Sequence, residues 1–206
     1  MSFESLGLPA ALARAVADSG YTQPTDVQTR AIPPAMAGSD LRVSSSTGSG
    51  KTAAFVLPAL TRVLAARGDA SKRRDNKTVH GPRVLVLAPT RELAMQVAKA
   101  TDSYGRHIPG LRVATIVGGV PYHAQLKALR GPLDVLIATP GRLMDHMANG
   151  KAVLANVEML VLDEADRMLD MGFIDDIKHI ASFLPEQRQT VMFSATFAGP
   201  VGQLAQ

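Results

Sequence analysis

The segment Ser45–Thr52 (SSTGSGKT) combines the residue types that proteins use to hold phosphate groups. Glycines let backbone N–H groups approach an anion closely, and a helix starting at the end of the segment would add the positive end of its dipole. We expect Lys51 to supply a positive charge and the Thr52 hydroxyl to ligate Mg²⁺. The alternative is a Gly/Ser turn that only links a strand to a helix, and the Gly-Lys-Thr ending disfavours it. The predicted nucleotide-binding residues of this segment are Thr47, Gly48, Ser49, Gly50, Lys51 and Thr52.

Two carboxylates, Asp163 and Glu164, directly follow the apolar run 159–162. We expect Asp163 to hold the metal through water, and Glu164 to orient or deprotonate a water molecule that attacks the phosphate. Two solvated carboxylates at the start of a helix are the simpler reading of such a pair. A phosphate-binding loop in the same sheet favours the catalytic interpretation.

The elements that must position these residues follow a repeating pattern. Short apolar runs without alternation are typical of parallel strands covered by helices on both faces. Alternation of such runs with helical patterns predicts a doubly wound α/β fold. The expected strands are 41–43, 84–88, 113–117, 135–138, 159–162 and 191–193, and the expected helices are 53–66, 91–104, 123–129, 142–148 and 173–183.

Two segments do not follow this pattern. Residues 1–40 read as two helices, with Thr25-Asp26 as a helix cap and Pro33-Pro34 as a kink or break. Residues 67–82 are polar and highly charged, and we interpret them as a surface connection rather than a dedicated RNA clamp.

Composition narrows the class of protein. The chain has 206 residues, 46% of them hydrophobic and 19% charged, which is typical of one large globular domain. It contains no cysteine, which excludes disulfides, thiolate metal sites and a cysteine nucleophile. No apolar run approaches the roughly 20 residues of a membrane helix, and the N-terminus lacks a signal-peptide pattern, so we expect a cytoplasmic protein without a membrane partner. Basic residues gather between 67 and 112, which points weakly to a polyanionic partner.

Residues 163–166 spell Asp-Glu-Ala-Asp, and the chain resembles the N-terminal RecA-like domain of DEAD-box RNA helicases. Further motifs of that family follow in the same order along the chain. Each of the following segments is similar to one motif of the family: Gly20–Gln28 (GYTQPTDVQ) to the Q motif, Ser45–Thr52 (SSTGSGKT) to motif I, Pro89–Leu93 (PTREL) to motif Ia, Gly118-Gly119 to the GG motif, Thr139–Arg142 (TPGR) to motif Ib, and Ser194–Thr196 (SAT) to motif III. The resemblance implies a P-loop ATP-binding core over 41–206, with helices 1–40 packed on the same domain.

The resemblance also implies roles for individual residues. Gln28 would read adenine, and the upstream aromatic Phe3 would stack near the base. An amide fits the first role because it offers one donor and one acceptor; taken alone, Phe3 would be a core or docking aromatic. Arg91, Gly119, Thr139 and Arg142 would lie along the RNA backbone, and Ser194 and Thr196 would hydrogen-bond to Asp166 and couple hydrolysis to RNA binding.

The implied function is that of an ATP-dependent RNA helicase, with ATP or ADP and Mg²⁺ as cofactors and RNA bound without sequence preference. Ser45 stands where the strict phosphate-loop pattern has glycine, and Ser45 and Ser46 replace the Ala and Gln usual in the family. Motifs of a second RecA-like domain, including its arginine finger, are not found in the chain. We therefore expect one lobe of a monomeric two-lobed enzyme, nearly inactive by itself. A nucleotide-holding module with little turnover and a DNA-directed motor are the alternatives.

Overall fold

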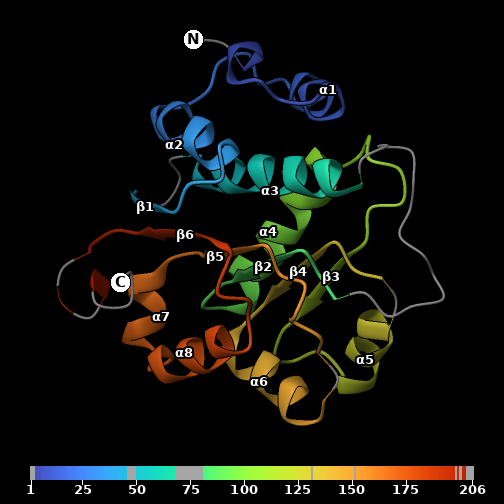
Figure 1. Cartoon of the computed structure of the whole chain (residues 1–206), viewed down its shortest axis with the longest axis vertical. Helices are drawn as coiled ribbons and strands as arrows, with labels where there is room; N and C mark the ends of the chain where they lie inside the picture. Colours follow the sequence, from blue (N-terminus) through green and yellow to red (C-terminus); the bar gives the residue numbers. More distant parts are fainter. Residues whose placement is uncertain are drawn as a thin grey trace.

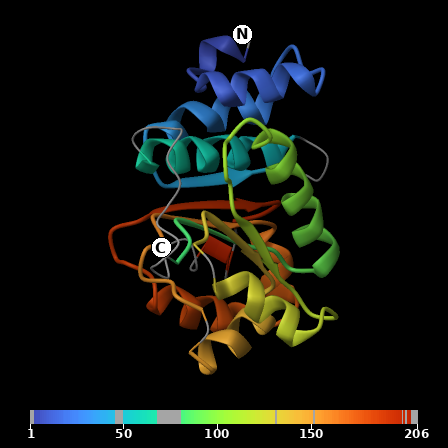
Figure 2. The same cartoon turned by 90° about the vertical axis from the view of Figure 1, so that its right-hand side faces the viewer.

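The computed structural model of the protein describes residues 3–45, 50–67, 81–130, 132–150, 152–197, 199 and 201–202. A six-stranded parallel sheet lies between two layers of helices, as Figures 1 and 2 show. The predicted α/β class with a parallel sheet is confirmed. The strands are β1 Leu41–Ser44, β2 Val84–Leu87, β3 Val113–Ile116, β4 Val135–Ala138, β5 Met159–Leu162 and β6 Gln189–Ser194.

Helices α2 to α4 cover one face of the sheet, with α1 packed on the outer side of α3 and α4, and α5 to α8 cover the other face. The short α7 was not predicted, because six residues cannot show a helical period. Most of the charged segment 67–82 lies outside the described residues, and none of the described helices has the length and apolar character needed to cross a bilayer. The helices are α1 Ala10–Asp18, α2 Asp26–Met36, α3 Lys51–Arg67, α4 Arg91–Tyr104, α5 Tyr122–Arg130, α6 Pro140–Ala148, α7 Ala165–Asp170 and α8 Ile174–Ser182, preceded by a 3-10 turn at Glu4–Leu6.

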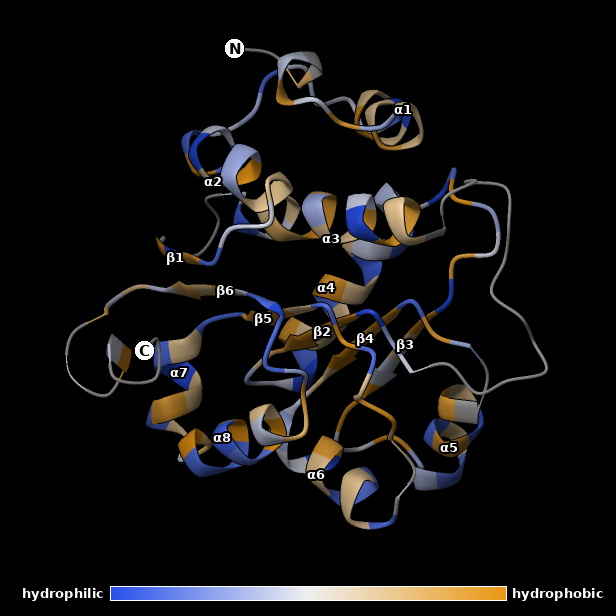
Figure 3. Ribbon diagram, in the orientation of Figure 1, coloured by the Kyte–Doolittle hydropathy of each residue, from blue (hydrophilic) through white to orange (hydrophobic). Residues whose placement is uncertain are grey.

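The central strands are apolar throughout because both of their faces are buried. In β2, Val84 and Val86 belong to the core on one face, whereas Leu85 and Leu87 belong to the core on the other. Every residue of β2, β4 and β5 is buried. Colouring by hydropathy shows hydrophobic strands between helices of mixed character (Figure 3). Truncating one of these leucines to alanine typically costs about 2–5 kcal/mol, so the runs that predicted the strands also stabilise them.

The order of the strands across the sheet is β1-β6-β5-β2-β4-β3. Because all pairs are parallel, every strand ends at the same edge of the sheet. The segments that follow β1, β6 and β5 therefore lie along one half of this carboxyl edge. Those that follow β2, β4 and β3 lie along the other half. In open α/β sheets, ligands bind outside the carboxyl ends of the strands.

Helix α2 confirms one sequence prediction and corrects another. Thr25 caps the helix: its hydroxyl accepts from Gln28 N, and its own N–H donates to Gln28 Oε1 at 2.9 Å. The expected break at Pro33-Pro34 is wrong, because α2 runs through both prolines to Met36. A proline removes an N–H and leaves the carbonyl one turn earlier without its donor. Pro33 is exposed, so water can reach this part of the helix.

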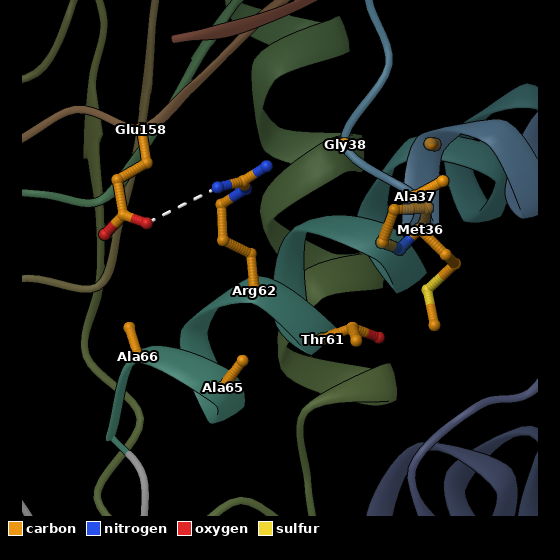
Figure 4. A pocket seen from close by; sticks show the side chains of 10 residues that line it. Met36, Ala37, Gly38, Thr61, Arg62, Ala65, Ala66 and Glu158 are labelled. Atoms are coloured by element: carbon orange, nitrogen blue, oxygen red, sulfur yellow. Dashed lines mark hydrogen bonds and ion pairs between the residues drawn. The ribbon is translucent and has the colours of Figure 1, made fainter. Parts of the chain in front are cut away.

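The amino edge of the sheet is tied to α2 and α3 by a second set of polar contacts. The Gln189 side chain, 4% exposed, donates to the carbonyl oxygens of Ala35 and Ser39 and accepts from Arg62 at 2.8 Å. Arg62 also points toward Glu158 across a pocket of about 400 Å³ (Figure 4). These contacts fix the start of β6, at the edge opposite the phosphate-binding segment.

Candidate active site

The amino group of Lys51 lies between the two carboxylates that follow β5. It is 2.9 Å from Asp163 Oδ1 and 3.0 Å from Glu164 Oε2. The side chain of Asp163 is 2% exposed, that of Lys51 10% and that of Glu164 13%. Lys51 begins α3 after β1, and the carboxylates follow β5, so strand β6 between them sets their separation. The structure thus brings together the three residues predicted to act on phosphate.

Burial raises the pKa of Asp163, and the nearby Lys51 ammonium acts in the opposite direction. The backbone N–H of Asp163 donates to the Leu87 carbonyl at 2.9 Å, which fixes the carboxylate at the end of β2. Glu164 adopts a left-handed conformation with φ of 54°. No other non-glycine residue in the described part of the chain has a positive φ. Such strain costs about 1–3 kcal/mol and gathers at functional sites, so it supports a special role for Glu164.

A cavity of about 300 Å³ opens beside the Lys51 bridge. Arg167, which the sequence analysis did not single out, lies in its wall with its guanidinium 3.9 Å from Glu164. Its position three residues after Glu164 on a helix start is the signal that could have found it. Thr47, Gly48 and Ser49 lie outside the described residues. The cavity is lined by Ser45, Lys51, Glu164, Asp166, Arg167, Ser194 and Ala195.

The residues at the cavity fit a nucleotide-bound Mg²⁺. This ion needs only one or two protein oxygen ligands, because waters and phosphate oxygens complete its coordination. Thr52 in the first turn of α3 and Asp163 offer such oxygens. The ammonium of Lys51 already places one positive charge between the carboxylates. The buried hydroxyl of Ser45 has no hydrogen-bond partner among the described residues, which leaves a further polar atom available there.

Gln28 connects helix α2 to the phosphate-binding segment. Its Nε2 donates to the Gly50 carbonyl at 3.0 Å, and its Oε1 accepts the Thr25 N–H. Gly50 has φ of +85°, and a Cβ added there would lie 2.7 Å from Gln28 Nε2. Only glycine fits this approach. The amide keeps one free N–H and one free lone pair, the pair of groups needed to read adenine.

Phe3 is buried in the structure. Its side chain is 7% exposed and belongs to the same core cluster as Leu6 and Leu12. This burial fits a core aromatic, the alternative that its sequence position alone allowed. Stacking of Phe3 near the base stays a prediction.

Two of the residues predicted to contact RNA meet at the other half of the carboxyl edge. Arg91 begins α4 after β2, and Gly119 lies in the turn after β3. Gly119 has φ of +83°, and a Cβ there would lie 2.7 Å from Arg91 Nη1. Arg91 is exposed and takes part in none of the ion pairs or hydrogen bonds found in the described residues. Its charge is therefore free for a ligand.

The other two predicted RNA contacts follow β4. Thr139 is 9% exposed and precedes α6, and its N–H donates to the Ile116 carbonyl. Arg142 is partly buried, with 22% of its side chain exposed, and its Nη1 donates to the Val120 carbonyl at 3.0 Å. All four residues thus line one half of the edge. Arg142 also holds the turn that contains Gly119.

Ser194, one of the predicted coupling residues, lies beside the Lys51 bridge and has a different hydrogen-bond partner from the one expected. The Ser194 hydroxyl donates to the Thr196 carbonyl at 2.6 Å. A hydroxyl has one proton, so in this structure Ser194 does not donate to Asp166. Both Ser194 and Asp166 line the same cavity. The proposed coupling would need Ser194 to exchange partners.

Comparison with known proteins gives a consistent result. Residues 25–204 match the sequence model of the family described as "DEAD/DEAH box helicase". The chain is 42% identical to the ATP-dependent RNA helicase DeaD of Haemophilus influenzae over 204 residues. The matched segment covers 99% of this chain and 31% of that protein. It is 44% identical to DeaD of Escherichia coli (95% of this chain, 29% of that protein) and 46% identical to DEAD-box ATP-dependent RNA helicase 52A of Oryza sativa (98% and 35%). The chain spans about a third of the length of these relatives.

Proposed function

Because this chain belongs to the DEAD/DEAH box helicase family, we propose that it is the nucleotide-binding lobe of an ATP-dependent RNA helicase. The observation that carries the proposal is the Lys51 bridge to Asp163 and Glu164 beside a cavity at the carboxyl edge of the sheet. A cation and two carboxylates at the end of a phosphate-binding segment are the groups that ATP hydrolysis requires. The relatives are about three times as long as this chain, which leaves room for the second RecA-like lobe that the family resemblance implies.

We assign the hydrolytic roles as follows. Lys51 would exchange its carboxylate partners for phosphate oxygens, where its charge stabilises the bound nucleotide. Mg²⁺, when bound near Thr52 and Asp163, supplies charge neutralisation to the phosphates. Release from Lys51 leaves Glu164 free to hold a water molecule and accept its proton. The left-handed backbone of Glu164 aims its carboxylate back toward the same cavity that Lys51 lines.

RNA would lie along the other half of the carboxyl edge, over Arg91, Gly119, Thr139 and Arg142. The free charge of Arg91 and the bare backbone of Gly119 support this placement, because both suit a phosphate chain. Contacts to the RNA backbone fix the position of the protein on the strand but do not distinguish one base from another, so we propose binding without sequence preference. The strand order supports two adjacent sites, because the nucleotide half ends at β5 and the RNA half begins at the neighbouring β2.

Adenine nucleotides should bind in preference to guanine nucleotides through Gln28. Guanine carries a carbonyl where adenine has its amino group, so one dipole of the Gln28 amide would be mispaired. An unpaired buried polar group costs about 1–3 kcal/mol, or roughly 5- to 150-fold in affinity. The measurement is displacement of a fluorescent adenosine nucleotide from the chain by ADP and by GDP. Equal displacement would contradict the assignment.

The variants Gln28→Ala and Gln28→Glu test whether this preference comes from the amide. Gln28→Glu keeps the acceptor for the Thr25 N–H but loses the donor to Gly50. Both variants should lose the preference for ADP, whereas only Gln28→Ala should also lose the hydrogen bond from the Thr25 N–H, worth about 0.5–1.5 kcal/mol in the free energy of unfolding. If both Gln28 variants still bound ADP in preference to GDP, adenine recognition would belong to another residue.

Arg91→Ala should weaken RNA binding by a similar factor for every sequence. For single strands, the slope of log affinity against log salt changes by about 0.7 for each phosphate contact. We therefore expect the slope to become shallower by about 0.7 in Arg91→Ala, measured with two unrelated single-stranded RNAs. Arg112→Ala is the matched control, because Arg112 is an exposed arginine just before β3, at the opposite edge of the sheet. Equal changes in both variants would show only a general charge effect.

A further inference from the structure

A buried hydrogen-bond network holds the turn between β3 and α5. Gln125 of α5 is 2% exposed, and its Nε2 donates to the Val117 carbonyl at 2.6 Å. Arg142 Nη1 donates to the Val120 carbonyl at 3.0 Å and to Gln125 Oε1 at 3.3 Å. Val117 and Val120 flank the pair Gly118-Gly119. Two connected side chains therefore fix both ends of the turn that carries the proposed RNA-contacting backbone.

His146 of α6 is the third side chain of this network, through its contact with Gln125. It is fully buried, and its Nε2 lies 2.9 Å from Gln125 Oε1. Because Gln125 Nε2 donates to Val117, the amide oxygen must face Arg142 and His146, and it can only accept. His146 Nε2 therefore carries the proton. The ring stacks on Tyr122 with centroids 4.3 Å apart and planes at 5°. Burial, followed by the charge of Arg142, lowers the pKa of His146, which favours the neutral ring.

We propose that Gln125 and His146 are positioning residues for RNA binding, which set Arg142 and the Gly118-Gly119 turn in the arrangement that meets the RNA backbone. The inference rests on the proposed function. Neither side chain reaches the surface, so each acts through Arg142 and the peptide groups of the turn. The effect extends to Arg91, because Gly119 lies directly against its guanidinium.

The first test compares two buried glutamines at opposite edges of the sheet. Gln125→Ala removes hydrogen bonds to Val117, Arg142 and His146, and the control Gln189→Ala removes hydrogen bonds to Ala35, Ser39 and Arg62. We expect Gln125→Ala to weaken RNA binding about tenfold, as loss of a buried hydrogen bond does. Gln189→Ala should lower the thermal unfolding temperature comparably and leave RNA affinity within about twofold of the parent. Both variants should bind ADP like the parent. Equal RNA affinities in the two variants would overturn the proposal.

A double-mutant cycle separates positioning from general destabilisation. If Gln125 acts through Arg142, Gln125→Ala should cost much less RNA affinity in the Arg142→Ala background, about threefold or less. Fully additive losses would show that Gln125 does not act through Arg142. Loss of the RNA effect of Arg91→Ala, or failure of the parent to bind RNA, would overturn the proposed function itself. Weakened binding by Arg91→Ala beside normal binding by Gln125→Ala would overturn this inference alone.

Hydrogen exchange tests the positioning step without RNA. The amide of Ala124 donates to the carbonyl of Pro121, at the end of the turn, at 3.2 Å. This amide should exchange at least about tenfold faster in Gln125→Ala than in the parent, because the turn loses its anchor at Val117. It should keep the parent rate in Gln189→Ala. Unchanged exchange of the Ala124 amide in Gln125→Ala would overturn the proposal, whatever the RNA affinity.

Discussion

Lys51→Ala should lose nucleotide affinity, whereas Glu164→Gln should keep it and lose hydrolysis. Lys51 contributes its charge to the bound phosphates, and loss of such a charged contact costs about 1.5–3 kcal/mol, or roughly 10- to 150-fold in affinity. Glu164→Gln keeps the shape of the side chain and the Lys51–Asp163 pair but cannot take a proton from water. General-base catalysis of this kind is worth about 10²–10⁴ in rate.

The structure adds a second difference between the two variants. Without nucleotide, Lys51 is the cation beside the nearly buried Asp163 and the mostly buried Glu164. Its removal leaves two carboxylates close together, and breaking a buried ion pair from one side costs about 3–5 kcal/mol. Lys51→Ala should therefore unfold at a clearly lower temperature, and Glu164→Gln close to the parent temperature. Calorimetry without nucleotide measures this difference.

The two variants are compared by nucleotide titration of the chain and by ATP hydrolysis in a version extended by a second RecA-like lobe. If Glu164→Gln hydrolyses ATP at the parent rate, Glu164 is not the base. If Lys51→Ala binds ATP like the parent, the Lys51 bridge in the free protein does not mark a phosphate site. Arg112→Ala again serves as a control, because it removes a positive charge far from the cavity.

The 206-residue chain by itself should bind ATP and hydrolyse it very slowly. The cations that line the cavity among the described residues are Lys51 and Arg167, and both contact Glu164. Lys51 is assigned to the phosphates of the bound nucleotide, so neither residue is a second cation reserved for the charge that develops on the transferred phosphate. An arginine supplied by an opposing lobe, as the family resemblance implies, is worth about 10³–10⁵ in rate in phosphoryl transfer.

The test is ATP hydrolysis with and without single-stranded RNA, by the chain and by the extended version at equal concentrations. We expect the extended version to hydrolyse ATP faster than the chain by a factor within the range given above, and RNA to stimulate only the extended version. The variant Arg167→Ala in the chain shows whether Arg167 acts in place of the missing arginine. Stimulated turnover by the chain at the rate of the extended version would reject the one-lobe proposal.

Most of the strands and helices, and the residue types of the candidate site, could be predicted from the sequence. Strands such as β2 and β5 were predictable because a strand buried on both faces must be apolar at every position. The phosphate segment, the two carboxylates and the Thr25 cap depend on residue types over short spacings, which a sequence displays directly. The break predicted at the prolines of α2 was wrong. The lost hydrogen bond that a proline causes can be read from the sequence, but the stabilisation that the helix gains from its buried residues cannot.

Which of these residues come into contact could not be predicted from the sequence, because it depends on the order of the strands in the sheet. The runs 41–43, 159–162 and 191–193 are equivalent as apolar strands, and nothing local to them states that β6 lies between β1 and β5. That order sets Lys51 between Asp163 and Glu164 and divides the carboxyl edge into two halves. It also places α5 and α6 so that Arg142 can donate to Gln125. Such contacts join residues far apart in the chain, and they form only when the whole sheet and both helical layers pack together, since a hydrogen bond depends on distances of a few ångströms.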